Sequence, residues 1–283
     1  MAFARMQPGA EIIAVDAMQV YRGMDVGTAK PTIDDRRRIP HHCLDLVHPW
    51  EEFTVADFVT AAAASIADIE RRGGTPVLVA GTGLYLRSLT DPMNLPGQWP
   101  AIRTLLERRA EREGARALHD ELVLVDPLAA SRIEPDNARR VVRALEVVMG
   151  SGRPFSSFGP GLGQYAPTRF RMVGLRWARP ALAERIEDRV ERMFAAGLPD
   201  EVRRLLDAPS GMSRTARQAL GYKELIEHFE GRCSMEEALE EIVVRTRQYS
   251  VRQERWFRRD PRITWVDIER DPVAEVLPVL EQP

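Results

Sequence analysis

A carboxylate and several other polar side chains follow a short apolar run near the start of this chain. Ile12 to Val15 is uninterrupted by polar residues, which is typical of a strand buried in a parallel sheet. Asp16 comes directly after it, at the strand end where open α/β sheets bind ligands. Gln19, Tyr21 and Arg22 then add groups that can hydrogen-bond to a nucleobase or stack on it. The stretch predicts a ligand-contacting loop, and the alternative is that Asp16 only caps the next helix.

A second stretch, TPVLVAGTGLY, has the same order of a strand and then polar groups. Pro76 to Ala80 predicts another buried parallel strand. Gly81-Thr82-Gly83 follows as a tight turn into a helix, and such a turn can present backbone N–H groups to an anion. Many α/β loops contain Gly-x-Gly, so the turn gains weight from its expected position beside Asp16.

The composition is typical of a globular protein, and the low number of cysteines indicates a reducing compartment. It has 283 residues, of which 44% are hydrophobic and 29% charged, with a net charge of −2. This balance argues against indiscriminate nucleic-acid binding but allows a local basic face. Cys43 and Cys233 are too few and too distant for a disulfide framework or a zinc site, so a cytoplasmic location is expected. No apolar run reaches membrane length, and Met1 to Gly9 lacks the apolar segment of a signal peptide.

The remaining patterns predict an α/β core interrupted by helices. Segments 1–95 and 165–283 carry the strand patterns, including Phe170 to Trp177 and Ile263 to Val266. Segment 96–164 shows only helical spacing and is bounded by stretches rich in proline and glycine, so it predicts an inserted helical module. The adjacent histidines at positions 41 and 42 would point to opposite faces of a strand, which argues against a metal site there.

The stretch EIIAVDAMQVYRGMDVGTAKP, taken with AGTGLY, resembles the tRNA dimethylallyltransferases. The resemblance implies a P-loop-NTPase-like parallel sheet flanked by helices, with nucleotide or ATP binding as a property of that class. It implies that Asp16 is the base facing N6 of adenosine 37 and that Thr82 is a hydroxyl near the diphosphate. It also implies that Asp16, Ala17, Met18 and Gln19 contact the anticodon stem-loop of tRNA.

Two later motifs extend the resemblance. The helix pattern NARRVVRALE is similar to a tRNA-contacting element of the family and places Arg139 and Arg143 one turn apart, on one face. A salt-bridged surface helix is the alternative for that pair. The pattern QALGYKEL is similar to another such element, in which Tyr222 can stack on a base. The tRNA contacts implied by the two motifs, together with a family arginine in the module, are Arg103, Arg139, Arg140, Arg143, Gln218, Gly221, Tyr222 and Lys223.

The family's phosphate-binding loop, G-x-x-x-x-G-K-[ST], has no match anywhere in these 283 residues. Either the start at Met1 is misassigned or the protein lacks this loop, in which case the chain as given is a catalytically impaired tRNA-binding relative. Without the strand that precedes the loop, the strand at Ile12 to Val15 is expected to have an unpaired edge. A P-loop kinase is a third interpretation, but it needs the same loop. The resemblance implies dimethylallyl diphosphate as donor and Mg²⁺ held on the loop. We also expect no membrane association and a monomer.

Overall fold

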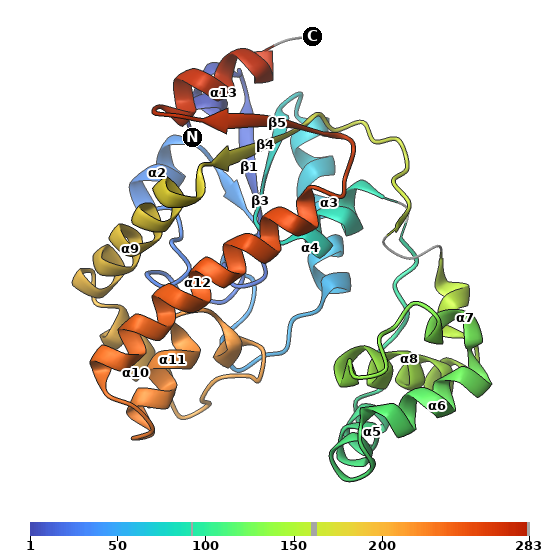
Figure 1. Ribbon diagram of the computed structural model, residues 1–283. Coiled ribbons are helices and arrows are strands. Elements are labelled where there is room, and N and C mark those ends of the chain that lie inside the picture. The colour runs from blue at the N-terminus through green and yellow to red at the C-terminus, as the bar shows by residue number, and fades with distance from the viewer. Residues whose placement is uncertain (92, 160–162, 282–283) are drawn as a thin grey trace. The chain divides into compact units, whose positions relative to one another are not determined.

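The computed structural model describes residues 1–91, 93–159 and 163–281, so residues 92 and 160–162 of the expected linkers, and 282–283, lie outside it. The chain divides into two compact units (Figure 1). We call them the core unit, Met1–Asp91 with Thr168–Pro283, and the inserted unit, Pro92–Pro167. The sequence patterns predicted the inserted segment at 96–164. No described helix is both long enough and apolar enough to cross a membrane.

The strands described in the core unit are all parallel and form two sheets. β1 (Ala10–Val15) lies between β2 (His41–His42) and β3 (Thr75–Ala80). β4 (Met172–Trp177) pairs with β5 (Ile263–Ile268) in the second sheet. Parallel strands alternating with helices confirm the predicted α/β class.

β1 is the central strand of its sheet. All six of its residues are buried, as the apolar run Ile12 to Val15 predicted. Ile13 is in register with His42 on one side and with Leu78 on the other. The expectation of an unpaired edge on this strand is therefore wrong. The edge strands are β2 and β3, and Val79 on β3 is 56% exposed.

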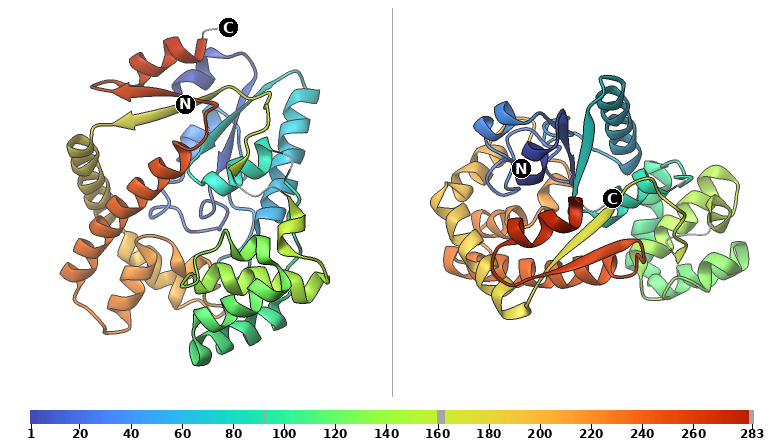
Figure 2. Two further views of the ribbon diagram at one scale, coloured as in Figure 1. Left: turned by 45° about the vertical axis from the view of Figure 1, so that its right-hand side comes forward. Right: turned by 90° about the horizontal axis from the view of Figure 1, so that it is seen from above.

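Helices of the core unit cover both sheets. α3 (Val55–Arg71) begins at Thr54, whose side chain forms a capping box with Asp57, and it packs beside β3 (Figure 2). α13 (Pro272–Glu281) packs on β4 and β5. The other core-unit helices are α1 (Ala2–Met6), α2 (Ile33–Arg38), α4 (Gly83–Thr90), α9 (Arg179–Ala195), α10 (Leu198–Leu206), η3 (Ala216–Gln218), α11 (Tyr222–Phe229) and α12 (Met235–Phe257).

The long helix α12 connects the two ends of the core unit. It contacts α9 and α11, and near its C-terminal end it reaches α4 (Figure 1). The contact with α4 depends on Gly83, because a Cβ there would lie 2.2 Å from the ring of Trp256. Glycine at the start of α4 therefore lets α12 approach the turn that carries Thr82.

Among its described residues, the inserted unit contains helices and connecting segments but no strand. Its helices are α5 (Pro100–Glu113), α6 (Ala115–Val125), α7 (Pro127–Ala130), α8 (Ala138–Ser151) and η1 (Phe155–Phe158). Leu106, Leu118 and Leu145, which come from α5, α6 and α8, are at most 1% exposed and form its apolar core together with smaller residues. The unit thus has a core of its own, separate from that of the core unit.

Candidate active site

Asp16 ends β1 and organises the loop that follows. Its Oδ1 accepts hydrogen bonds from the backbone N–H groups of Met18, at 2.7 Å, and Gln19, at 3.1 Å. No helix follows before α2, so Asp16 holds a turn rather than a helix N-terminus. Among the described residues, no hydrogen bond holds Oδ2. A Cβ at Gly81 would lie 3.5 Å from Oδ2, which is an ordinary contact distance.

Thr82 lies across from the Asp16 loop, as the sequence predicted, but the glycine turn differs from expectation. Thr82 Oγ1 accepts a hydrogen bond from Ala17 N–H at 3.3 Å, and this bond joins the two loops. The N–H groups of Gly81 and Thr82 both donate to the carbonyl of Val15, at 3.3 and 3.4 Å. The expectation that these two groups face an anion is therefore wrong.

For two side chains that the sequence analysis did not assign, the charge of Asp16 contributes to the pKa shift. Tyr249 on α12 donates to the Gly81 carbonyl at 3.3 Å, and burial together with the Asp16 carboxylate raises the pKa of its phenol. Burial lowers the pKa of Arg189 on α9, while the charge of Asp16 opposes that shift. The charge of Asp16 therefore acts on a phenol and on a guanidinium. The only sequence signal for Arg189 was its place in an arginine stripe with Arg185 and Arg192.

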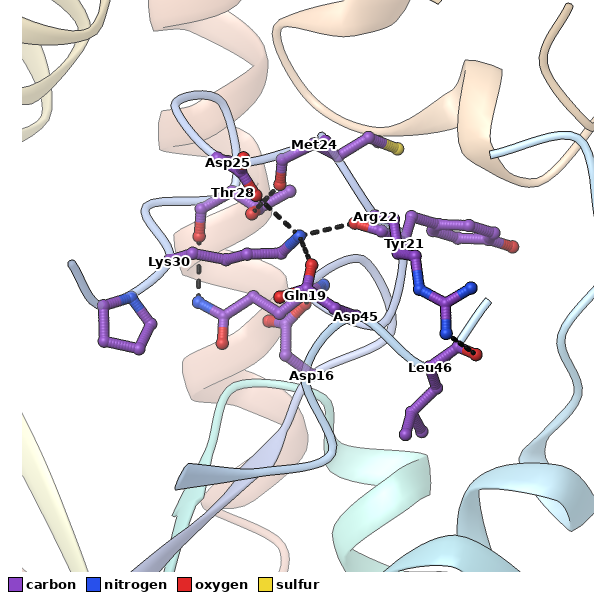
Figure 3. A network of polar contacts seen from close by, with 12 residues as sticks. Asp16, Gln19, Tyr21, Arg22, Met24, Asp25, Thr28, Lys30, Asp45 and Leu46 are labelled. Atoms are coloured by element: carbon purple, nitrogen blue, oxygen red, sulfur yellow. Dashed lines mark hydrogen bonds and ion pairs between the residues drawn. The ribbon is translucent and has the colours of Figure 1, made fainter. Parts of the chain in front are cut away.

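Lys30 stabilises the inside of the Asp16 loop (Figure 3). Its side chain is 1% exposed, and Nζ donates to the Tyr21 carbonyl at 2.5 Å, to Asp25 at 2.8 Å and to Asp45 at 2.6 Å. Gln19 donates to the Thr28 carbonyl at 3.0 Å. The loop between Asp16 and Lys30 is therefore closed by internal bonds before any ligand binds.

Glu201 on α10 holds the far side of the same loop. Its buried carboxylate accepts three consecutive backbone N–H groups, those of Asp25 and Val26 at 2.9 Å and of Gly27 at 3.2 Å. Tyr222 donates its hydroxyl to the same carboxylate at 2.5 Å. A Cβ at Gly27 would lie 2.4 Å from the Tyr222 ring, so only glycine permits this approach.

This arrangement changes the role expected of Tyr222. The residue is fully buried, so its ring cannot stack on a tRNA base, and that expectation is wrong. Gly221 is also buried and has a φ of +86°, which fits the backbone to the start of α11. Gln218 is exposed, and Lys223 is half-buried with Glu227 3.9 Å away. Gln218 and Lys223 are therefore the polar side chains of this motif that solvent reaches.

The four arginines expected to contact tRNA in the inserted unit fall into two kinds. Arg103 and Arg143 both form ion pairs with Glu146, at 2.8 and 2.9 Å, and the Glu146 side chain is fully buried. Arg143 also donates to the Pro96 and Gly97 carbonyls, at 2.9 and 3.0 Å. Arg139 and Arg140 are exposed at the start of α8. Arg139 and Arg143 are therefore not equivalent, although they lie one turn apart.

The described residues do not by themselves form a Mg²⁺ site. Within residues 1–91, 93–159 and 163–281, no group of three His, Cys, Asp or Glu side chains could hold a metal ion. Asp16 and Thr82 offer fewer oxygens than the six that Mg²⁺ requires. His42 pairs with Glu11 at 2.6 Å.

The core unit is thus a parallel α/β domain with a carboxylate and a hydroxyl at the carboxyl ends of β1 and β3, as in ligand-binding α/β enzymes. The family model described as IPP transferase matches residues 19–260. The chain is 49% identical over 256 residues to the tRNA dimethylallyltransferase of Nocardioides sp., covering 90% of this chain and 82% of that protein. It is 48% identical over 262 residues to the same enzyme of Geobacter metallireducens, covering 92% and 84%.

The solved structures to which this chain is similar include transferases with related names. The full-length tRNA isopentenylpyrophosphate transferase of Bacillus halodurans superposes with a TM-score of 0.69 at 36% identity, covering 98% of this chain and 89% of that chain. A eukaryotic dimethylallyltransferase acting on tRNA gives 0.76 at 27% identity, covering 94% and 69%. The chain belongs to the IPP transferase family, in which the matched relatives are tRNA dimethylallyltransferases, a class of prenyltransferase.

Proposed function

We propose that this protein transfers a dimethylallyl group from dimethylallyl diphosphate to N6 of adenosine 37, next to the anticodon of tRNA. The observation that carries the proposal is the Asp16 carboxylate. One of its oxygens is fixed by two backbone N–H groups, and the other is free of hydrogen bonds among the described residues. A base held in this way is positioned before substrate binds.

In the proposed reaction, Asp16 accepts a proton from the exocyclic amine as the nitrogen attacks C1 of the dimethylallyl group. The new N–C1 bond forms while the C1–O bond to diphosphate breaks, and the electron pair leaves with the diphosphate. The Thr82 hydroxyl donates to the departing oxygen. The adenine has to leave the anticodon-loop stack to reach Asp16, as other base-modifying enzymes require.

The proposed RNA contacts lie in both units. In the core unit they are Asp16, Ala17, Met18, Gln19, Gln218 and Lys223. Gly221 and Tyr222 are buried, and we propose that they hold these residues in position. In the inserted unit, which we propose as the tRNA-binding module, they are Arg103, Arg139, Arg140 and Arg143. Exposed arginines suit phosphates, which fix position, and the Asp16 loop suits a base, which gives specificity.

The remaining parts of the proposal concern the setting of the reaction. Mg²⁺ is expected to accompany the diphosphate, since phosphate oxygens and water supply most ligands of this ion in such sites. No step above depends on it. Cys43 and Cys233 are both free thiols, which supports a reducing, cytoplasmic location. We propose that the protein acts as a monomer.

The test compares Asp16→Ala and Asp16→Asn with the unchanged protein, with and without an added N-terminal strand and G-x-x-x-x-G-K-[ST] loop. In the extended protein, both substitutions should lower the rate of prenyl transfer to an anticodon stem-loop by roughly 10²–10⁴-fold, because the proton acceptor is lost. Stem-loop affinity should change by no more than a few fold. Asp34→Ala, at an exposed position on α2, is the control.

Two outcomes would contradict the proposal. Comparable turnover by Asp16→Ala would remove Asp16 as the base. Stem-loop binding without any transfer, in the extended protein as well, would favour the alternative of a tRNA-binding relative without catalytic activity.

A further inference from the structure

An aromatic pair lies at the end of the segment that follows β2. The His48 and Trp50 rings are stacked, with centroids 4.2 Å apart and planes 6° from parallel. Trp50 is 44% exposed, so His48 covers part of the indole and much of the remainder is open to solvent. Arg22, from the Asp16 loop, places Nη1 3.1 Å from His48 Nε2. The three side chains form an ordered group, which we call the Trp50 platform.

The backbone beneath the platform is fixed at several points. Val47 N–H donates to the Val20 carbonyl at 3.1 Å, and the Val47 carbonyl accepts from Arg22 N–H at 2.9 Å. Pro49 is buried, and its carbonyl accepts from Ser213 N–H at 2.7 Å. Trp50 therefore sits on a segment that is bonded both to the Asp16 loop and to the segment before η3, and it does not hang on a free loop.

Single exposed apolar side chains are common on protein surfaces and need no explanation. The Trp50 platform differs because a second aromatic ring and a guanidinium already hold the geometry. A flat ring presented on a rigid backbone is the arrangement that binds an unstacked nucleobase. The side chains are already ordered in the free protein, so binding of a ligand loses less conformational entropy.

The location suits a base of the same RNA. β2 and β1 are parallel neighbours, so the segments that follow them leave the sheet at one edge. Figure 3 shows Arg22 and Leu46 in the same network view as Asp16 and Gln19. Two carboxylates lie close to the platform in the chain: Glu51 accepts from His48 N–H at 2.6 Å, and Glu52 accepts from the Thr215 hydroxyl at 2.8 Å. Their charge disfavours a phosphate and leaves an uncharged base as the suitable occupant.

We propose that the Trp50 platform stacks a second, unpaired nucleobase of the anticodon loop, near the base that enters the site at Asp16. This proposal rests on the proposed function, because it takes the RNA bound by the Asp16 loop as its partner. The second base would hold the loop in an unstacked conformation and so make it easier for the first base to reach Asp16.

The test measures binding of an anticodon stem-loop RNA to the 283-residue protein and to Trp50→Ala and Trp50→Phe. Stacking on one aromatic side chain is worth about fivefold to 150-fold in affinity, so Trp50→Ala should weaken binding by that factor and Trp50→Phe by less. The slope of log affinity against log salt should stay unchanged, since no phosphate contact is lost. Thermal unfolding of each variant, expected to match the unchanged protein, checks that the fold is intact.

A set of RNAs with one abasic site at each loop position identifies the base. One of these abasic RNAs should bind the unchanged protein with the same reduced affinity that the intact RNA has for Trp50→Ala. The same abasic RNA and the intact RNA should bind Trp50→Ala with equal affinity, because the stacking contact is already lost. If the intact RNA binds Trp50→Ala with an affinity within about twofold of that for the unchanged protein, Trp50 does not stack a base of this RNA. The proposed function would then still stand, and the exposed indole would serve another class of partner. No stem-loop binding by the unchanged protein would overturn both proposals.

Discussion

The Asp16 loop and helix α8 are both proposed to contact RNA, yet their polar groups are arranged in opposite ways. In the loop, the one lysine is 1% exposed and bonded to three oxygens, and three backbone N–H groups point inward at Glu201. At the start of α8, Arg139 and Arg140 are exposed to solvent. The loop uses its charges to keep its own shape, whereas α8 presents charge outward.

This difference separates two parts of recognition. A loop closed by internal bonds can select a base by shape and by a few fixed donors and acceptors, and it adds little long-range attraction. Exposed arginines attract any phosphate backbone and carry most of the salt dependence of binding. With a net charge of only −2, attraction to RNA has to come from local groups such as these. Substitutions in the loop should therefore affect stability and chemistry, and substitutions on α8 should affect affinity.

The largest stability effect is expected at Glu201. Glu201→Ala should lower the free energy of unfolding by about 3–5 kcal/mol, because three backbone N–H groups and the Tyr222 hydroxyl lose their shared acceptor. Glu201→Gln keeps one acceptor oxygen and should cost less. The measurement is urea unfolding of each variant, with Asp200→Ala, at the exposed neighbouring position, as control. Equal losses in Glu201→Ala and Asp200→Ala would show that the carboxylate does not hold the loop.

A smaller effect, on affinity, distinguishes the two kinds of arginine in the inserted unit. Arg139→Ala should weaken stem-loop binding and reduce the slope of log affinity against log salt by roughly one unit or less, with an unchanged unfolding temperature. Arg143→Ala should also lower the unfolding temperature, because Glu146 is fully buried and loses one of its two ion-pair partners. A salt slope unaffected by either change would return α8 to the alternative of a salt-bridged surface helix.

The sequence predicted the elements whose signals are local. The apolar runs at Ile12 to Val15 and Pro76 to Ala80 became β1 and β3, and the capping residues Thr54 and Asp57 set the start of α3. Asp16 and Thr82 could be placed near each other because parallel strands end at one edge of a sheet. These inferences needed only periodicity, turn chemistry and the rules for parallel sheets.

Contacts between distant segments could not be predicted in the same way. Glu201 lies 174 residues after Gly27, and an acidic residue in the first turn of a helix usually faces solvent. Tyr222 follows a glycine in a motif that resembles an RNA contact, and no local pattern shows that its ring is buried under the loop. The roles of Glu201 and Tyr222 become clear only in the folded protein, where α10, α11 and the Asp16 loop pack together.

The smallest predicted effect concerns Glu11, a carboxylate that, like Glu201, is hydrogen-bonded to its neighbours. Glu11 on β1 is 8% exposed and is bonded to Arg72 at 2.6 and 3.1 Å and to His42 at 2.6 Å. These bonds lower the pKa of Glu11 from 4.5 to about 2, with Arg72 the main cause. The unfolded chain binds the proton first as pH falls, so this contribution to stability is complete above pH 4.5 and is lost between 4.5 and about 2.

Because Arg72 is half-exposed, we expect the contribution to be only about 1–2 kcal/mol. The measurement is the free energy of unfolding in urea at pH 6 and pH 3. Glu11→Gln should lose stability at pH 6 and lose less than the unchanged protein on going to pH 3, because the group that titrates has been removed. Glu191→Gln, at an exposed position on α9, should keep the pH dependence of the unchanged protein. If Glu11→Gln kept it as well, the acid sensitivity would have to come from other carboxylates, and the Arg72–Glu11–His42 contacts would be as weakly coupled to folding as an ordinary surface ion pair.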